Sequence, residues 1–179
     1  MELCTTSLDR VFLENNDPNK YNGPMPSNDQ AVLLQLANGL GYLHSLKILH
    51  GDIKPENILI SLTGESVQMK WTGFGFRKSN LNDACSTSIS QSATRMGSRR
   101  WWAPETYKDE ANVSEIGETF SAGCVFLYFL SGGLHLFANP DHGEFKVSNN
   151  VTNGKIVNRI GIHNFKQFTI SKNYCFFIF

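Results

Sequence analysis

The sequence has few cysteines, no excess of charge and no apolar run long enough to span a bilayer. Its four cysteines, at positions 4, 85, 124 and 175, form no Cys-x-x-Cys pair and have no metal-ligand spacing with the five histidines, which argues against a disulfide framework and a zinc site. Sixteen basic residues balance sixteen acidic ones, so no overall positive field favours a nucleic-acid partner. The longest apolar stretch, Phe120 to Leu130, is about half the length of a transmembrane helix.

The first residues also lack the features of a secretory signal. Met1 to Thr6 contain neither a basic n-region nor an apolar h-region. A cytoplasmic location is therefore the simplest expectation, on the cytosolic side if the chain is part of a longer membrane-anchored protein. With 179 residues, 41% of them apolar, the chain is long enough to bury one substantial core.

Periodicity predicts two long helices. A loop rich in Asn, Asp, Pro and Gly ends at 27–30, which has capping-box spacing. An apolar stripe at three- and four-residue steps then predicts an amphipathic helix to about Leu46, carried by Leu33, Leu36, Leu40 and Leu43. A second segment, Glu118 to Ser131, is apolar on nearly every face and precedes Gly132 and Gly133, which is typical of a buried central helix.

Short β-prone runs lie between these helices, at Ile48–Leu49, Asn57–Ile60 and Val67–Trp71. From Gly73 to Ser98 the composition shifts to Ser, Thr, Asn and Arg, which predicts a long exposed loop. The fold class expected is therefore α+β, mainly helical with small β-hairpins.

One short segment, His50 to Asn57, has the residue types needed for phosphoryl transfer. That reaction needs a carboxylate near the attacking oxygen, a cation near the phosphate and ligands for magnesium. Asp52 is the candidate base or orienting group, Lys54 the phosphate contact and Asn57 the metal ligand. Each alone has an ordinary structural interpretation, but the pattern His-x-Asp-x-Lys-x-x-Asn arises by chance in such a chain with a probability on the order of 10⁻³ or less.

These residues resemble the catalytic loop of eukaryotic protein kinases, and Lys54 two residues after Asp52 is typical of serine/threonine kinases. Three further motifs follow in the family's order. Gly73 to Gly75 stand where the family has Asp-Phe-Gly, Ala103 to Glu105 match its Ala-Pro-Glu, and Phe120 to Gly123 resemble the start of its central helix. The resemblance is to the C-terminal lobe of the kinase fold.

Within kinases the sequence is most similar to the inositol-requiring kinase/endoribonuclease of the unfolded protein response and to ribonuclease L-like kinases. The segments that carry this likeness are 43–46, 57–61, 97–101 and 121–126. It implies ATP and Mg as cofactors and protein Ser/Thr as substrate. It also implies a hinge at Glu2 to Cys4, with Cys4 and Leu59 contacting the nucleotide. The resemblance covers 1–155, a partial kinase domain of hinge and C-lobe, whereas 156–179 are unlike the family and are expected to form an irregular tail.

The sequence also departs from the family. Gly73 replaces the Asp that holds magnesium, Gly51 replaces an Arg that pairs with a phosphorylated loop, and Glu118 replaces an Asp that accepts hydrogen bonds from the catalytic-loop backbone. No Gly-rich loop or strand lysine precedes the hinge, so we expect the N-lobe to be absent. Nucleotide binding and transfer by this chain are therefore expected to be lost or strongly impaired.

Three hypotheses follow from these features. The chain is an active serine/threonine kinase, a non-catalytic pseudokinase module that binds partners, or a truncated gene product without independent function. The sequence identifies no particular protein substrate or partner. Without an N-lobe, we expect exposed apolar surface around Leu3, Leu59 and Trp71.

Overall fold

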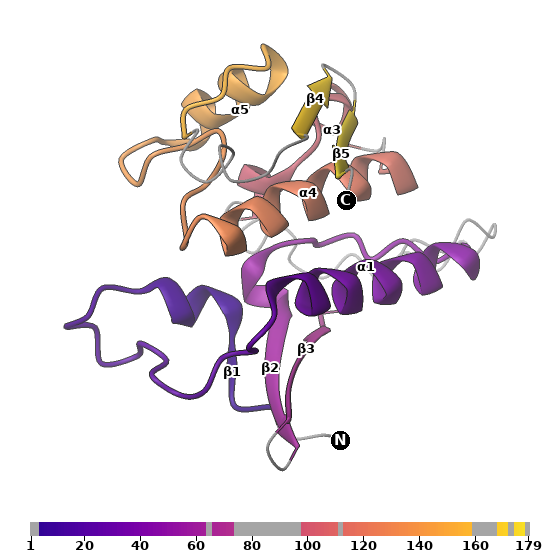
Figure 1. Cartoon of the computed structure of the whole chain (residues 1–179). Helices are drawn as coiled ribbons and strands as arrows, with labels where there is room; N and C mark the ends of the chain where they lie inside the picture. The colour runs from indigo at the N-terminus through magenta and orange to yellow at the C-terminus, as the bar shows by residue number, and fades with distance from the viewer. Residues whose placement is uncertain are drawn as a thin grey trace, which may run out of the picture.

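A computed structural model describes residues 4–63, 66–73, 98–110 and 113–158, and the backbone of 168–171 and 174–177. Figure 1 shows two long helices near the centre, with a small sheet on one side of them and the shorter helices on the other. The predicted loop of 73–98 lies outside the described residues except at its two ends. Within the described residues, no helix is both long and apolar enough to span a membrane.

The first long helix, α1, runs Asp29–Ser45 and confirms the predicted amphipathic helix. Its N-cap is Asn28, one residue later than the start of the capping pattern. The Asn28 side-chain oxygen accepts a hydrogen bond from the Ala31 N–H at 3.2 Å, which satisfies one of the free donors at the helix start. Three members of the predicted stripe, Leu33, Leu36 and Leu40, are buried together with Val32, whereas the fourth, Leu43, is half-buried.

Three antiparallel strands form a sheet in the order β1-β2-β3. They are β1 (Thr6–Ser7), β2 (Ile58–Thr63) and β3 (Ser66–Trp71), and the short helix η1 (Leu8–Phe12) follows β1. In the register, Thr6 lies opposite Ile60, and Ile58 lies opposite Trp71. Ile58 and Ile60 are fully buried, so one face of β2 contributes directly to the core.

Trp71 joins this sheet to α1. Its indole Nε1–H donates to the Leu36 carbonyl at 2.8 Å, and the residue is only 9% exposed. The expectation of exposed surface at Trp71 was therefore wrong, because α1 covers the indole and satisfies its donor. Leu59 is half-buried, and Leu3 lies outside the described residues.

The second long helix, α4 (Glu115–Leu130), is the predicted buried central helix. It begins at the N-cap Ser114, whose hydroxyl oxygen accepts from the Gly117 N–H at 3.1 Å. Most of its residues are buried, which confirms its central position; they are Gly117, Glu118, Phe120 to Leu127 and Phe129. The shorter elements η4 (Arg99–Trp101), α3 (Pro104–Lys108) and α5 (Glu144–Thr152) lie on the other side of α4 from α1 (Figure 1).

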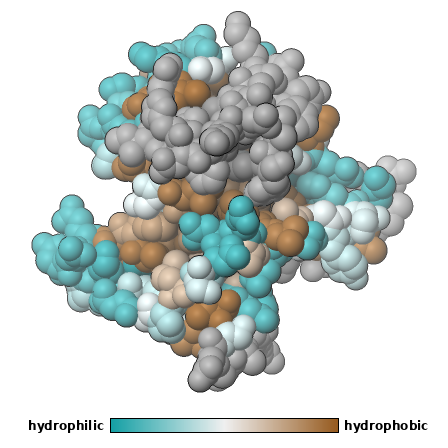
Figure 2. Space-filling model, in the orientation of Figure 1, coloured by the Kyte–Doolittle hydropathy of each residue, from teal (hydrophilic) through white to brown (hydrophobic). Residues whose placement is uncertain are grey.

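The C-terminal part of the chain contains two strands, β4 (Phe168–Ser171) and β5 (Tyr174–Phe177), which pair antiparallel with Ser171 opposite Tyr174. Both strands lie within 156–179, for which the sequence predicted an irregular tail. In these two stretches the backbone is extended and paired. On the face shown in Figure 2, hydrophobic residues come to the surface near the β2–β3 hairpin and beside α1. Large apolar side chains that are exposed include Leu34, Tyr42, Leu46 and Leu62.

Candidate active site

The predicted catalytic loop, His50 to Asn57, lies between α1 and β2. It passes through the short helix η2 (Pro55–Asn57), where Pro55 occupies the first helical position and its ring fixes the backbone angle that the turn needs. Gly51 has a φ of 82°, a left-handed conformation that favours glycine. The Arg that the family has at this position would be strained in this backbone, which gives a local reason for glycine here.

The three predicted transfer residues come together in one hydrogen-bonded group. The Lys54 Nζ lies 2.9 Å from Asp52 Oδ2. The Asn57 amide Nδ2 donates to the same Oδ2 at 2.8 Å and to the Asp52 carbonyl oxygen at 2.7 Å. The side chains of Lys54 and Asp52 are 12% and 9% exposed, so this pair is largely shielded from water and its charges interact strongly.

Ser98 is a fourth member of this group. Lys54 Nζ donates to the Ser98 hydroxyl oxygen at 2.8 Å, across 44 positions of sequence. Ser98 was noted in the sequence only as part of a family likeness, and no role was predicted for it. The likeness at 97–101 is the one sequence feature that includes Ser98. It does not predict the contact with Lys54, because that contact joins residues 44 positions apart.

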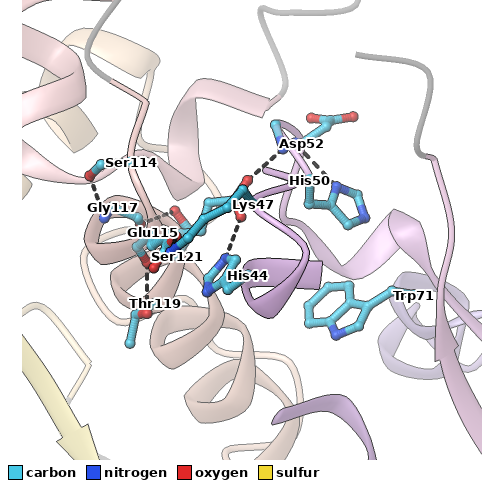
Figure 3. A network of polar contacts seen from close by, with 12 residues as sticks. His44, Lys47, His50, Asp52, Trp71, Ser114, Glu115, Gly117, Thr119 and Ser121 are labelled. Atoms are coloured by element: carbon cyan, nitrogen blue, oxygen red, sulfur yellow. Dashed lines mark hydrogen bonds and ion pairs between the residues drawn. The ribbon is translucent and has the colours of Figure 1, made fainter. Parts of the chain in front are cut away.

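His50 connects the loop to Trp71 of β3. The ring is fully buried, its Nδ1 accepts a hydrogen bond from the Asp52 N–H at 3.3 Å, and it meets the Trp71 ring edge-on at 5.6 Å. Figure 3 shows the imidazole lying between the Asp52 backbone and the indole. Burial lowers the pKa of His50, which favours the neutral ring that this acceptor role requires.

Glu118 anchors the same loop to α4. Its Oε1 accepts from the Gly51 N–H at 2.6 Å, as the resemblance to the family implied, so the longer side chain still reaches the loop. Its Oε2 lies 2.8 Å from Nε2 of His44 at the end of α1, and the Glu118 side chain is only 4% exposed. No role was predicted for His44. Its carboxylate contact spans 74 positions, and no local pattern marks it.

Gly73 lies beside Asn57, the predicted metal ligand, and contributes no carboxylate there. Its φ is 84°, and a Cβ added there would lie 2.7 Å from both Cγ and Oδ1 of Asn57. The described residues contain no group of three or more His, Cys, Asp or Glu side chains placed to hold a metal. Magnesium prefers carboxylate oxygens, and a single neutral amide oxygen is a weak substitute. The residues present therefore do not fit magnesium in the family's arrangement.

The two predicted nucleotide contacts lie on the sheet. Leu59 is half-buried in β2, opposite Ser7 and Lys70, and Cys4 is half-buried just before β1. Neither side chain takes part in the hydrogen bonds described for Asp52, Lys54 and Asn57. Their role in nucleotide binding remains a prediction.

Comparison with known proteins gives the family. A family model described as the protein kinase domain matches residues 1–174. The chain is 40% identical over 146 residues to the serine/threonine-protein kinase/endoribonuclease IRE2 of Homo sapiens, covering 78% of this chain and 15% of that protein. It is 33% identical over 187 residues to ireA of Aspergillus fumigatus, covering 86% and 16% respectively. It is 36% identical over 129 residues to IRE1 of Oryza sativa subsp. japonica, covering 72% and 14%.

The matched part of the chain thus spans 14–16% of the length of these curated relatives, which share the description serine/threonine-protein kinase/endoribonuclease. The family match reaches residue 174, past the boundary at 155 that the sequence suggested. The helices, the small antiparallel sheet and the loop between them agree with the α+β character expected of a kinase-like fold. The chain belongs to the protein kinase domain family.

Proposed function

We propose that this chain is a serine/threonine kinase-like domain that keeps the geometry of the catalytic loop but transfers phosphate poorly or not at all. In this proposal, 1–155 correspond to the hinge and helical lobe of the kinase fold. The observation that carries it is the pair formed by Gly73 and Asn57, because a side chain at 73 would occupy the space that the Asn57 amide fills.

The roles proposed for the loop follow from its contacts. Asp52 is the group that orients a substrate hydroxyl and accepts its proton. Lys54, held between Asp52 and Ser98, is the cation that faces a phosphate. Asn57 orients the Asp52 carboxylate through its amide N–H. Cys4 and Leu59 are the proposed apolar contacts of an adenine base.

The missing carboxylate accounts for the proposed loss of activity. Magnesium neutralises the charge that develops on the phosphates during transfer. Removing a single electrostatic contact to a transition state typically slows an enzyme by about 10²–10³-fold. Loss of a metal-holding carboxylate is expected to cost at least that much. Within the described residues, no group of three or more His, Cys, Asp or Glu side chains is placed to hold a metal instead, and the nearby Asp52 carboxylate is already bonded to Lys54 and Asn57.

A transfer assay tests the proposal. The purified chain is incubated with Mg²⁺, radiolabelled ATP and a mixed Ser/Thr peptide library, beside an Asp52→Asn control. The control removes the proposed base and keeps the size of the side chain. We expect Asp52-dependent labelling to be absent or at least about 10²-fold slower than the turnover of about 1–100 s⁻¹ typical of protein kinases. Asp52-dependent labelling at a rate within that range would refute the proposal.

Calorimetry separates nucleotide binding from transfer. If the metal position is lost, titration with ATP should give the same weak signal with and without Mg²⁺. A saturable signal that requires Mg²⁺ and disappears in Asn57→Ala would contradict the proposed site. Lys47→Ala is a suitable control variant, because Lys47 is exposed and bonds only weakly to Glu115 at 3.4 Å.

A non-catalytic binding module is the second candidate. It is favoured by the closed set of bonds among Asp52, Lys54, Asn57 and Ser98. These bonds satisfy the polar groups of the loop without any ligand, so the loop keeps its shape in the absence of nucleotide. A module of this kind would present a kinase-like surface to a protein partner.

A further inference from the structure

The connection between α4 and α5, residues 131–143, contacts the segment that carries Ser98. Within this connection, the His135 ring lies 4.5 Å from the Trp101 ring, centroid to centroid. Its Nε2 lies 3.0 Å from the Arg100 carbonyl oxygen. The Arg100 Nη2 in turn donates to the His142 carbonyl at 2.6 Å. His135 and His142, both in the connection, therefore each form a hydrogen bond with Arg100 of η4.

The direction of the His135 hydrogen bond can be deduced. Its Nδ1 accepts from the Phe137 N–H at 3.1 Å, so Nδ1 carries no proton. The ring proton is then on Nε2, which donates to the Arg100 carbonyl. Burial lowers the pKa of His135 to about 4, so this neutral form with its single donor persists at neutral pH.

Arg100 and Ser98 are only two residues apart and belong to the same helical turn. Arg99–Trp101 form the single 3₁₀ turn η4, and Ser98 is its N-cap. The Trp102 N–H closes the turn on the Arg99 carbonyl at 3.1 Å, and the Tyr107 hydroxyl also donates to that carbonyl. A bond to the Arg100 carbonyl therefore restrains the backbone of η4, at whose N-terminus Ser98 lies.

We propose that His135 is a positioning residue, which places the Ser98 hydroxyl on Lys54 through the hydrogen bond from its Nε2–H to the Arg100 carbonyl. The described connections run from His135 to Arg100, through η4 to Ser98, and from Ser98 to the Lys54 ammonium beside Asp52. The inference rests on the proposed function for its meaning in catalysis, but the geometry that it predicts can be measured without any turnover.

A purely local role for His135 makes the opposite prediction. In that case the important bond is the one from the Phe137 N–H to Nδ1, which braces the connection itself. Two variants separate these roles. In His135→Gln the amide nitrogen can take the place of Nε2 and donate to Arg100, whereas in His135→Asn the amide oxygen can take the place of Nδ1 and accept from Phe137.

The readout is the rate at which a water-soluble, amine-reactive acetylating reagent modifies Lys54, measured by mass spectrometry. The ammonium is held by Ser98 and Asp52, so losing the Ser98 contact exposes it. We expect His135→Asn to raise the rate by about fivefold, the population change that the loss of one neutral hydrogen bond produces. We expect His135→Gln to label like the unmodified protein. Lys47, whose side chain is 75% exposed, serves as the internal reference.

Two further measurements complete the test. Ser98→Ala should raise Lys54 labelling at least as much as His135→Asn, because it removes the bond from the charged ammonium directly. The double variant should label like Ser98→Ala alone, because both changes break one pathway. In the unmodified protein, the ¹⁵N shifts of His135 should report a proton on Nε2. A proton on Nδ1, additive labelling in the double variant, or equal labelling in the two His135 variants would overturn the proposal.

Discussion

The anchor at Glu118 gives the sharpest prediction about stability. Its carboxylate holds two elements at once, the Gly51 N–H at 2.6 Å and His44 Nε2 at 2.8 Å, and its side chain is only 4% exposed. Glu118→Ala removes both bonds and leaves two polar groups without their acceptor in a nearly dry site. Hydrogen bonds to charged groups contribute about 1.5–3 kcal/mol each, so the expected loss in the free energy of unfolding is about 3–5 kcal/mol.

Two milder variants sharpen this prediction. Glu118→Gln keeps an oxygen for Gly51 and an amide that a neutral His44 can accept from, so the expected loss is about 1 kcal/mol. Glu118→Asp restores the residue type of the family but shortens the side chain by one methylene. Because the two partners lie on different elements, the shorter carboxylate should reach only one of them, at a cost of about 1–2 kcal/mol.

Urea unfolding followed by far-UV circular dichroism measures these differences. A double-mutant cycle with His44→Ala tests whether the two residues act together. The combined loss should be clearly smaller than the sum of the single losses, since each single change already breaks the shared contact. A loss below 1 kcal/mol for Glu118→Ala, or strictly additive losses, would refute the reasoning.

The remaining predictions concern backbone strain and pH. Gly73→Ala should lose about 2–3 kcal/mol, because it adds left-handed strain and displaces the Asn57 amide from Asp52; Gly132→Ala, with a φ of 74° and open space around the added methyl, should lose only the strain term of about 1 kcal/mol. Equal urea midpoints for the two variants would contradict this account. The pKa of His135 is lowered to about 4 in the folded chain, against about 6.5 unfolded. Protons thus bind the unfolded state more strongly, and stability present above pH 6.5 should fall by up to roughly 3 kcal/mol as the pH drops to 4, with a shallower fall in His135→Gln.

The sequence predicted the parts of the fold that repeat locally. The stripe of Leu33, Leu36 and Leu40 located α1, and the continuous apolar character of 118–131 located α4. The catalytic loop was found from spacing alone, and Asp52, Lys54 and Asn57 do meet in one group. In each case the information lies within a single segment of 8 to 14 residues (33–40, 118–131 and 50–57), where a period or a motif can record it.

The sequence could not reveal contacts that depend on the closure of the whole chain. The bond between Lys54 and Ser98 spans 44 positions, and the contact between His44 and Glu118 spans 74. The burial of Trp71 was missed for the same reason. Its indole donates to a carbonyl of α1 that lies 35 positions earlier, and nothing in the local pattern of β3 indicates that partner.

These long-range contacts bear on how a kinase-type loop can persist beside Gly73. The loop is held from α4 by Glu118, from β3 by the ring of Trp71 on His50, and from η4 by Ser98. None of these supports involves a metal or a nucleotide. In the proposed function, the glycine at 73 therefore removes a contact to the metal without removing one that folds the loop. Glycine at 73 also spares the Asn57 amide a steric overlap and leaves it bonded to Asp52, so the change proposed to disable transfer is compatible with the loop geometry that transfer would use.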